Sequence, residues 1–263
     1  HRFFNDASLE DTYGRQFRGA SAGEIEGEKW PMTKVMREFD KPDISFSEMP
    51  YGFQLTTLRP LNEKLTHVRI TNALFPNTFV IPLSETMTIT QMHVPVDDTR
   101  TYWYAVFTSF ADPVNKDAMR NQRLEAVTLP DYIPKSGRHN QWGFNPEEQM
   151  TRTFLGMGED DINVHDQWAC ESMGAIQNRT REHLGTSDKV IIANRRILAK
   201  AIDDVAAGKV PPGFANADVA TSRIGPDTVD GIAPAHNWQT WATDTMQAKR
   251  DAAPWNASLT QAE

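Results

Sequence analysis

The sequence predicts an α+β fold in which an antiparallel sheet is followed by a long helix. Between residues 52 and 110, short runs alternate polar and apolar side chains and are separated by turn residues, which is typical of strands with one buried face. Between residues 161 and 207, the apolar side chains instead recur at a helical spacing. Strands first and helices later favour a sheet and helices in separate parts of the chain over alternating βαβ units.

Residues 1–60 are polar and rich in turn residues, so they are expected to be irregular apart from one short strand near their end. The next segments alternate as an antiparallel meander would, and the last of them is rich in aromatic and β-branched residues. The expected strands are Gly52–Leu58, Leu65–Ile70, Asn77–Pro82, Glu85–Val94 and Thr101–Phe110.

Helices are expected after residue 112, with a loop-like stretch at Leu129–Gln149 between the first and the second. Ser187 and Asp188 can cap the longest helix. The tail from Pro211 is rich in Ala, Asp and Pro, so residues 211–263 are expected to form an extension on the surface beyond a domain at 1–210. The expected helices are Asn115–Ala126, Asp166–Met173 and Ser187–Ala206, the last with an apolar stripe at Ile191, Ile192, Ile197, Leu198, Ile202 and Val205.

Composition and charge exclude several classes of protein. The chain has 263 residues, of which 39% are hydrophobic and 24% charged, as in a folded soluble domain. No apolar run is long enough to span a membrane. The net charge is −8, and Lys and Arg are scattered, so a nucleic-acid partner is not expected. The single cysteine, Cys170, fits a reducing, cytoplasmic compartment and excludes an intrachain disulfide.

The strongest motif runs from His165 to Asp188. It begins His-Asp-Gln-Trp-Ala-Cys-Glu-Ser-Met-Gly-Ala-Ile and continues as Asn-Arg-Thr-Arg-Glu-His-Leu-Gly-Thr-Ser-Asp. This segment resembles the catalytic domain of Rieske non-haem iron oxygenases, in the phthalate-dioxygenase-like branch that includes O-demethylases of lignin-derived aromatic acids. That branch has Gln, Pro and Asp where this chain has His165, Ala175 and Asn178. The strand segment Met92–Thr99 is also similar, and the resemblance covers residues 1 to about 210.

The resemblance implies a mononuclear Fe(II) held by two histidines and one carboxylate, which leaves open positions for dioxygen. The family carboxylate lies five residues before a Glu, and Asp166 with Glu171 reproduces that spacing. Asp166 is therefore the expected metal ligand and catalytic residue. Asp160 and Asp161 are the alternatives if the register is shifted. The competing interpretation makes Asp166 only the N-cap of a helix.

In the family the two histidines lie on one helix, in a pattern that ends in Leu-His. The chain opens on His1, which fits the second of these histidines, with the first lost upstream. His1 is therefore the second expected metal ligand, although a terminal residue without a role is equally compatible with the sequence. A start without Met and a single cysteine further suggest a chain truncated at its N-terminus, because a Rieske [2Fe-2S] cluster needs two Cys and two His.

By resemblance, the fold is expected to be a helix-grip (START/Bet v 1-like) sheet curved around a long C-terminal helix. The function is expected to be dioxygen activation that hydroxylates or O-demethylates an aromatic, carboxylated substrate. The expected partners are a Rieske cluster in the missing domain, a reductase or ferredoxin as electron donor, and further copies in a homotrimer or hexamer. One alternative is a helix-grip protein that binds a small molecule without catalysis. Another is a divalent-metal hydrolase, which would turn over without a reductant.

Other candidate residues have weaker patterns. His93 lies in a strand and could line a pocket if it faces inward, but a packed or solvent-facing histidine is the favoured interpretation at such a position. His165 could orient the carboxylate beside it. Arg179 and Glu182 are expected to form a structural ion pair.

Overall fold

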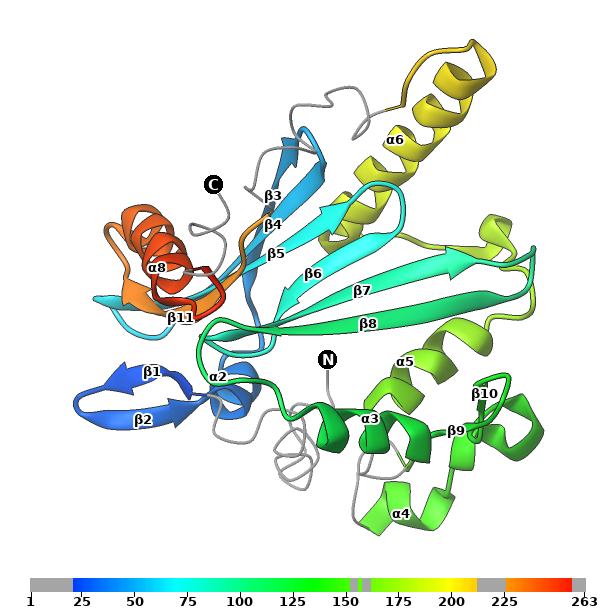
Figure 1. The fold of residues 1–263 in the computed structure, drawn as a ribbon, viewed down its shortest axis with the longest axis horizontal. Coiled ribbons are helices and arrows are strands. Elements are labelled where there is room, and N and C mark those ends of the chain that lie inside the picture. Colours follow the sequence, from blue (N-terminus) through cyan, green and yellow to red (C-terminus); the bar gives the residue numbers. More distant parts are fainter. Residues whose placement is uncertain (1–20, 152–155, 158–161, 212–225, 257–263) are drawn as a thin grey trace.

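The computed structural model describes residues 21–151, 156–157, 162–211 and 226–256. Its centre is a seven-stranded antiparallel sheet (Figure 1). Six strands follow one another in chain order, and a seventh, β11, pairs with β5. The strands are β3 (Asp43–Met49), β4 (Gly52–Pro60), β5 (Leu65–Leu74), β6 (Thr78–Pro82), β7 (Met87–Pro95), β8 (Thr101–Ser109) and β11 (Val229–Pro234).

The five strands predicted from alternation are all present, with ends shifted by a few residues. Sequence reasoning missed three strands and a helix before residue 52, because this segment is dense in turn residues. A small hairpin, β1 (Ser21–Ile25) with β2 (Glu28–Pro31), leads into α2 (Met32–Glu38), and β3 follows. Residues 21–51 are therefore ordered structure instead of the irregular segment that was predicted.

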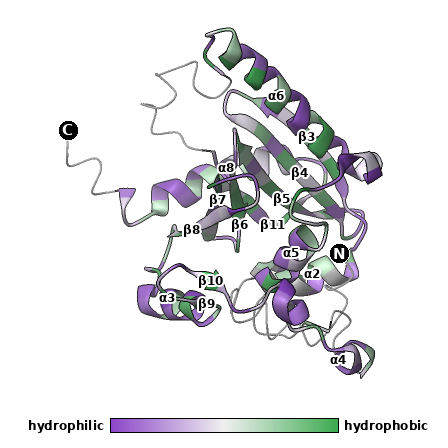
Figure 2. Ribbon diagram, turned by 90° about the vertical axis from the view of Figure 1, so that its right-hand side faces the viewer, coloured by the Kyte–Doolittle hydropathy of each residue, from purple (hydrophilic) through white to green (hydrophobic). Residues whose placement is uncertain are grey.

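The two faces of the sheet are covered by different helices (Figure 2). Phe53 and Phe79 point to the face that carries α6 (Lys189–Ala206), which is called the α6 face below. Val68 and Ile70 point to the opposite face, where α8 (Trp238–Ala252) packs. An antiparallel sheet gripping the long helix α6 confirms the predicted α+β helix-grip fold.

Shorter elements surround the sheet. The predicted helices at 115–126 and 166–173 are present as α3 (Lys116–Glu125), capped by the Asn115 side chain, and α5 (Ile162–Glu171). The stretch predicted as a loop contains only short elements: β10 (Ile133–Pro134), η2 (Arg138–Gly143) and α4 (Pro146–Thr151), with β9 (Val127–Thr128) just before it. Two 3-10 turns, η3 (Arg179–Arg181) and η4 (Thr186–Asp188), connect α5 to α6. Within the described ranges, no helix is both long and apolar enough to cross a membrane.

The expected capping of α6 and its apolar stripe need correction. Asp188 precedes the helix, but its carboxylate accepts a hydrogen bond from the backbone N–H of Gly185 (2.8 Å) and caps no amide of α6. Asn194 and Ile197 line the space between the helix and the sheet, whereas Ile202 is 70% exposed. The predicted stripe was therefore only partly the buried face.

The region expected as a surface extension contributes to the core in its described part. β11 pairs with β5 from Val229 opposite Ile70 to Pro234 opposite Leu65. Gly231 has no side chain at the point where Trp241 of α8 crosses the strand, and a Cβ there would lie 2.7 Å from the indole. Sequence reasoning missed both β11 and α8, since one short strand surrounded by Pro, Asp and Ala carries little periodic signal.

The edge of β5 that faces away from β4 is shared by two strands. Residues 72–74 of β5 pair with β6, whereas residues 65–70 pair with β11. The sheet therefore branches at the middle of β5, and the polar residues described below lie at this branch.

Candidate metal centre and aromatic pocket

Helix α5 carries the motif that predicted the metal site. Asp166 lies in its middle with an exposed side chain, whereas the neighbouring His165 is buried and 6% exposed. The other predicted ligand, His1, and the alternatives Asp160 and Asp161 fall outside the described residues. Within the described ranges, no three His, Cys, Asp or Glu side chains come together as a metal site. The described part thus places one of the predicted ligands, on a helix, in agreement with the helix expected there.

The C-terminal end of α5 is fixed by η2. Trp142 is buried, and its indole N–H donates to a carboxylate oxygen of Glu171 over 2.7 Å. Arg138 donates to the backbone carbonyl of Glu171 over 2.5 Å. Trp142 and Gln141 both have φ of +53°, a conformation that non-glycine residues rarely adopt. The Glu of the Glu-Ser-Met-Gly motif therefore connects α5 to a strained loop, which holds the helix in place.

The other oxygen of Glu171 accepts a hydrogen bond from Gln167 over 3.0 Å, and Gln167 also donates to the carbonyl of Ser136 over 2.8 Å. The same helix carries Cys170, whose thiol pKa is raised by partial burial and by the negative charges of Asp166 and Glu171. A raised pKa keeps the thiol protonated at neutral pH, so Cys170 is a poor nucleophile, as the sequence suggested.

A small pocket lies between α6 and the ends of β4, β5 and β6. The sheet supplies aromatic and small side chains, including Phe53, Ala73 and Phe79. Helix α6 closes the other wall with Asn194 and Ile197. The lining is mostly apolar and contains few polar groups, but the cavity measures only about 20 Å³, which is room for about one water molecule and less than a small-molecule site needs.

An aromatic row continues from this pocket along the α6 face. The ring centroid of His93 lies 5.6 Å from that of Phe79 and 5.8 Å from that of Trp103. Partial burial lowers the pKa of His93, so its imidazole is neutral near pH 7. His93 thus packs between two aromatic residues, as a packed histidine in a strand would, and it is not part of the cavity lining.

The segment after α5 is joined to α6 by an ion pair. Both guanidinium nitrogens of Arg195 contact the carboxylate of Glu182, one of them at 2.6 Å, and Gln177 donates to the same carboxylate over 3.1 Å. The hydrogen bonds from Arg195 hold the pKa of Glu182 below its usual value. Glu182 therefore has a structural partner, but it is Arg195 on α6 and not the predicted Arg179.

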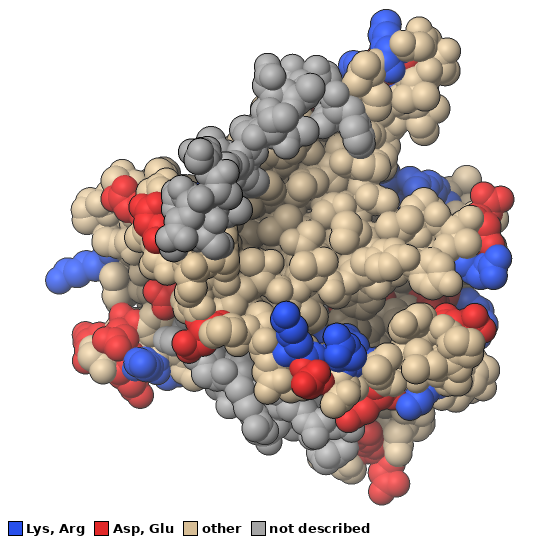
Figure 3. All heavy atoms as spheres, viewed as in Figure 1, with Lys and Arg blue, Asp and Glu red and all other residues tan. Residues whose placement is uncertain are grey.

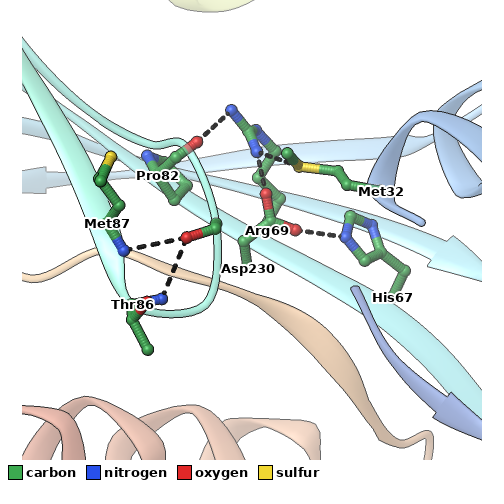
Figure 4. A network of polar contacts seen from close by, with 8 residues as sticks. Met32, His67, Arg69, Pro82, Thr86, Met87 and Asp230 are labelled. Atoms are coloured by element: carbon green, nitrogen blue, oxygen red, sulfur yellow. Dashed lines mark hydrogen bonds and ion pairs between the residues drawn. The ribbon is translucent and has the colours of Figure 1, made fainter. Parts of the chain in front are cut away.

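A buried charge cluster that no sequence pattern indicated lies at the branch in β5 (Figure 4). Asp230 of β11 is 2% exposed, and its carboxylate lies 2.5 Å from Nε2 of His67 and pairs through its other oxygen with Arg69. Arg69 also donates to the carbonyl of Pro82 over 2.7 Å and contacts the sulfur of Met32. The cluster connects β5, β6, β11 and α2.

The pKa shifts of the charged residues indicate that this cluster has a structural role. Burial alone would raise the pKa of Asp230, but Arg69, His67 and Arg59 together lower it, so the carboxylate remains ionised. The pKa of Arg59 is lowered by burial and by the nearby charge of Arg69. One carboxylate among two arginines and a histidine offers no site for a cation, and none of these residues lines the cavity beside α6.

Comparison with known proteins gives the chain its family. The model of a family described as LigXa C-terminal domain like matches residues 20–259, which is most of the chain. The chain belongs to this family.

Two curated relatives agree with this assignment. The chain is 28% identical over 177 residues to the phthalate 4,5-dioxygenase oxygenase subunit of Pseudomonas putida, covering 64% of this chain and 39% of that protein. It is 27% identical over 196 residues to the 3-chlorobenzoate-3,4-dioxygenase oxygenase subunit of Comamonas testosteroni, covering 67% of this chain and 45% of that protein. The resemblance to the phthalate-dioxygenase-like branch is thereby confirmed. The matches span less than half the length of these relatives, so the LigXa C-terminal domain-like unit corresponds to part of each.

Proposed function

We propose that this chain is the catalytic domain of a Rieske-type oxygenase, which activates dioxygen at a mononuclear Fe(II) to hydroxylate or O-demethylate an aromatic, carboxylated substrate. The observation that carries the proposal is the helix α5, which contains Asp166 and lies on the same side of the sheet as α6 (Figure 2). The names of the two relatives, both oxygenase subunits of aromatic-acid dioxygenases, support the reaction class.

The donor chemistry of the chain fits iron. Asp166 offers a carboxylate from an ordered helix, and His1 would supply an imidazole, two ligand types of the facial triad. When bound, Fe(II) would supply the reduction of dioxygen that the protein side chains cannot perform. The carboxylate of Glu171 accepts hydrogen bonds from Trp142 and Gln167, so its contacts would hold α5 in place while Asp166 acts as the ligand.

The other residues would bind and orient the substrate. The cavity of about 20 Å³ is smaller than an aromatic ring, so Phe79 and Ile197 would have to move apart for the ring to enter beside them, and both would then contact it. The amide of Asn194 would donate to a polar substituent such as a carboxylate or methoxy oxygen. The contacts of Glu171 with Arg138 and Trp142 would keep α5 at a fixed position relative to this ring.

Electrons would come from a Rieske [2Fe-2S] cluster recharged by a reductase or ferredoxin. The single cysteine of this chain cannot complete such a cluster, so it would be held outside these residues, on a neighbouring subunit of a trimer or hexamer. A reducing cytoplasm suits both the cluster and the free thiol.

The proposed ligand is tested in the parent protein that carries both domains. Asp166→Ala should abolish mononuclear iron, measured by metal analysis after reconstitution, while the visible spectrum of the iron–sulfur cluster persists. Asp160→Ala and Asp161→Ala are matched controls and should retain the iron. Loss of iron in one of these controls and its retention in Asp166→Ala would move the ligand to that position.

The reaction is tested with methoxylated and carboxylated aromatics, dioxygen and an electron donor, followed by mass spectrometry of the products. A product heavier by one or two oxygen atoms indicates hydroxylation, whereas a lost methyl group with formaldehyde indicates O-demethylation. Turnover without reductant would favour a metal hydrolase. Binding of aromatics without any turnover by the iron-loaded protein would favour the non-catalytic alternative.

A further inference from the structure

Strand β8 forms one border of the sheet, and its outer edge has no paired strand within the described residues (Figure 1). Residues 101–106 are all exposed, and the side chains of Tyr102, Trp103, Tyr104 and Val106 keep between 40% and 51% of their surface accessible. Such a strand presents backbone donors and acceptors together with apolar side chains.

The exposed segment of β8 itself lacks the features that usually prevent pairing with another strand, and the nearby α3 places Arg123 over the ring of Phe107, beyond that segment (6.0 Å). From Thr101 to Ala111 the sequence contains no charged residue, no proline and no glycine. The register with β7 runs without a bulge from Met87 opposite Ser109 to Pro95 opposite Thr101. Monomeric proteins commonly protect such edges with lysines, prolines or bulges.

The opposite border of the same sheet gives a contrast. Strand β3 carries Asp43 and Glu48 among its seven residues, and these charges disfavour pairing of that edge with another strand. On the face seen in Figure 3, the middle is largely uncharged, and charged side chains lie on its left and right sides and below the middle. The two edge strands therefore differ in sequence, since β3 carries two acidic residues and the segment from Thr101 to Ala111 carries no charge.

We propose that β8 pairs antiparallel with β8 of a second copy of this chain, around a two-fold axis at Tyr104. This register places Tyr102 opposite Val106 and Trp103 opposite Ala105 of the other copy. Aromatic side chains then meet β-branched or small ones, which are favourable cross-strand pairs.

The limits of the exposed segment support this register. Beyond Val106 the strand becomes half-buried, and at its end the indole N–H of Trp255 donates to the carbonyl of Ser109 over 2.9 Å. The open part is therefore centred near Trp103 and Tyr104. A second copy presents the same uncharged segment, so no like charges oppose each other. A two-fold contact cannot close a trimer, but it can join two trimers into a hexamer.

The register is tested by disulfide cross-linking in a Cys170→Ser background, in which the only thiol is the introduced one. Tyr104→Cys places two thiols directly across the axis, with Cα atoms roughly 5 Å apart, within disulfide range. Tyr102→Cys is a matched control on the same face with similar exposure, and its two copies lie roughly 13 Å apart along the strands. Mild oxidation should give covalent dimers from Tyr104→Cys only.

The association itself is tested by light scattering over a range of protein concentrations. Val106→Lys should at least halve the mass observed for the unmodified protein, with an unchanged thermal unfolding temperature. Ser47→Lys, on the exposed side of β3, should leave the mass unchanged. A mass insensitive to Val106→Lys, or equal cross-linking from both cysteine variants, would overturn the proposal.

Discussion

Trp142 donates its indole N–H to the carboxylate of Glu171, and this contact connects a loop in left-handed conformation to the end of the motif helix. The pair matters for function because α5 also carries Asp166, one turn earlier. The stability of the loop and the position of the proposed ligand are therefore coupled.

Replacement of Trp142 by Phe keeps a six-membered aromatic ring and removes the five-membered ring of the indole with its N–H donor. We expect the free energy of unfolding to fall by about 1 kcal/mol, because Glu171 is partly hydrated and loses one charge-assisted bond. Urea denaturation measures this loss, and Glu171→Gln, which retains an acceptor oxygen, should lose less. Equal stability of Trp142→Phe and the unmodified protein would show that the contact does not hold α5.

The pocket can be filled from α6. Ile197→Phe adds a larger side chain to the space beside Phe79 and Asn194, so we expect KM for an aromatic substrate to rise by roughly tenfold. The iron content should not change, since α5 is untouched. Ile202→Phe lies on the exposed side of the same helix and is the matched control. Equal KM values for the two variants would place the substrate elsewhere.

The buried cluster predicts a sensitivity to substitution and to acid. Asp230→Ala removes the only carboxylate in contact with His67 and Arg69 among the described residues, so we expect a loss of about 3 to 5 kcal/mol in the free energy of unfolding. The exposed ion pair of Asp97 with Arg100 is the control, and Asp97→Ala should have a much smaller effect.

The acid dependence follows from the direction of the pKa shift. The pKa of Asp230 is lower in the folded protein than in the unfolded chain, so its contribution is complete above about pH 4 and is lost as pH falls further. Urea midpoints measured between pH 3 and 7 should therefore fall more steeply for the unmodified protein than for Asp230→Asn. Parallel curves would contradict an ionised Asp230.

The lowered pKa of Lys249 predicts that the free energy of unfolding changes with pH in the alkaline range. Burial lowers its pKa to about 8, and its ammonium donates to the carbonyl of Thr228 over 2.6 Å. Between pH 8 and about 10.4 the unfolded chain binds more protons, so stability should rise with pH, by on the order of 2 kcal/mol. Thermal unfolding of Lys249→Met should lack this rise, whereas Lys200→Met, at an exposed position on α6, should keep it.

The sequence predicted the meander from β4 to β8 because period-two alternation over five segments is a strong signal of one buried face. It predicted α5 and α6 from helical spacing in the same way. It did not predict β11, because Asp230 is a polar residue in a short strand, and its burial depends on His67, 163 residues earlier.

The sequence predicted only the part of the candidate site that lies in the motif from His165 to Asp188. Asp166 and Glu171 were found by spacing, but the contact of Glu171 with Trp142 joins residues 29 positions apart in a loop with no periodicity. The pocket could not be predicted, since its walls combine Phe53, Phe79 and Ile197 from three distant segments. Such combinations depend on the register of the strands and on the rotation of α6.

The shared edge of β5 has a consequence for biosynthesis. The ribosome makes residues 65–70 long before residues 229–234, and a separation of about 160 residues corresponds to on the order of 10–30 s of translation. During that time residues 65–70 of β5 lack their partner strand β11, and Arg69 lacks the carboxylate of Asp230 with which it pairs. The nascent domain therefore stays incomplete at its centre until its last strand emerges, and a chain that ends before residue 229 would expose this edge to chaperones and proteases.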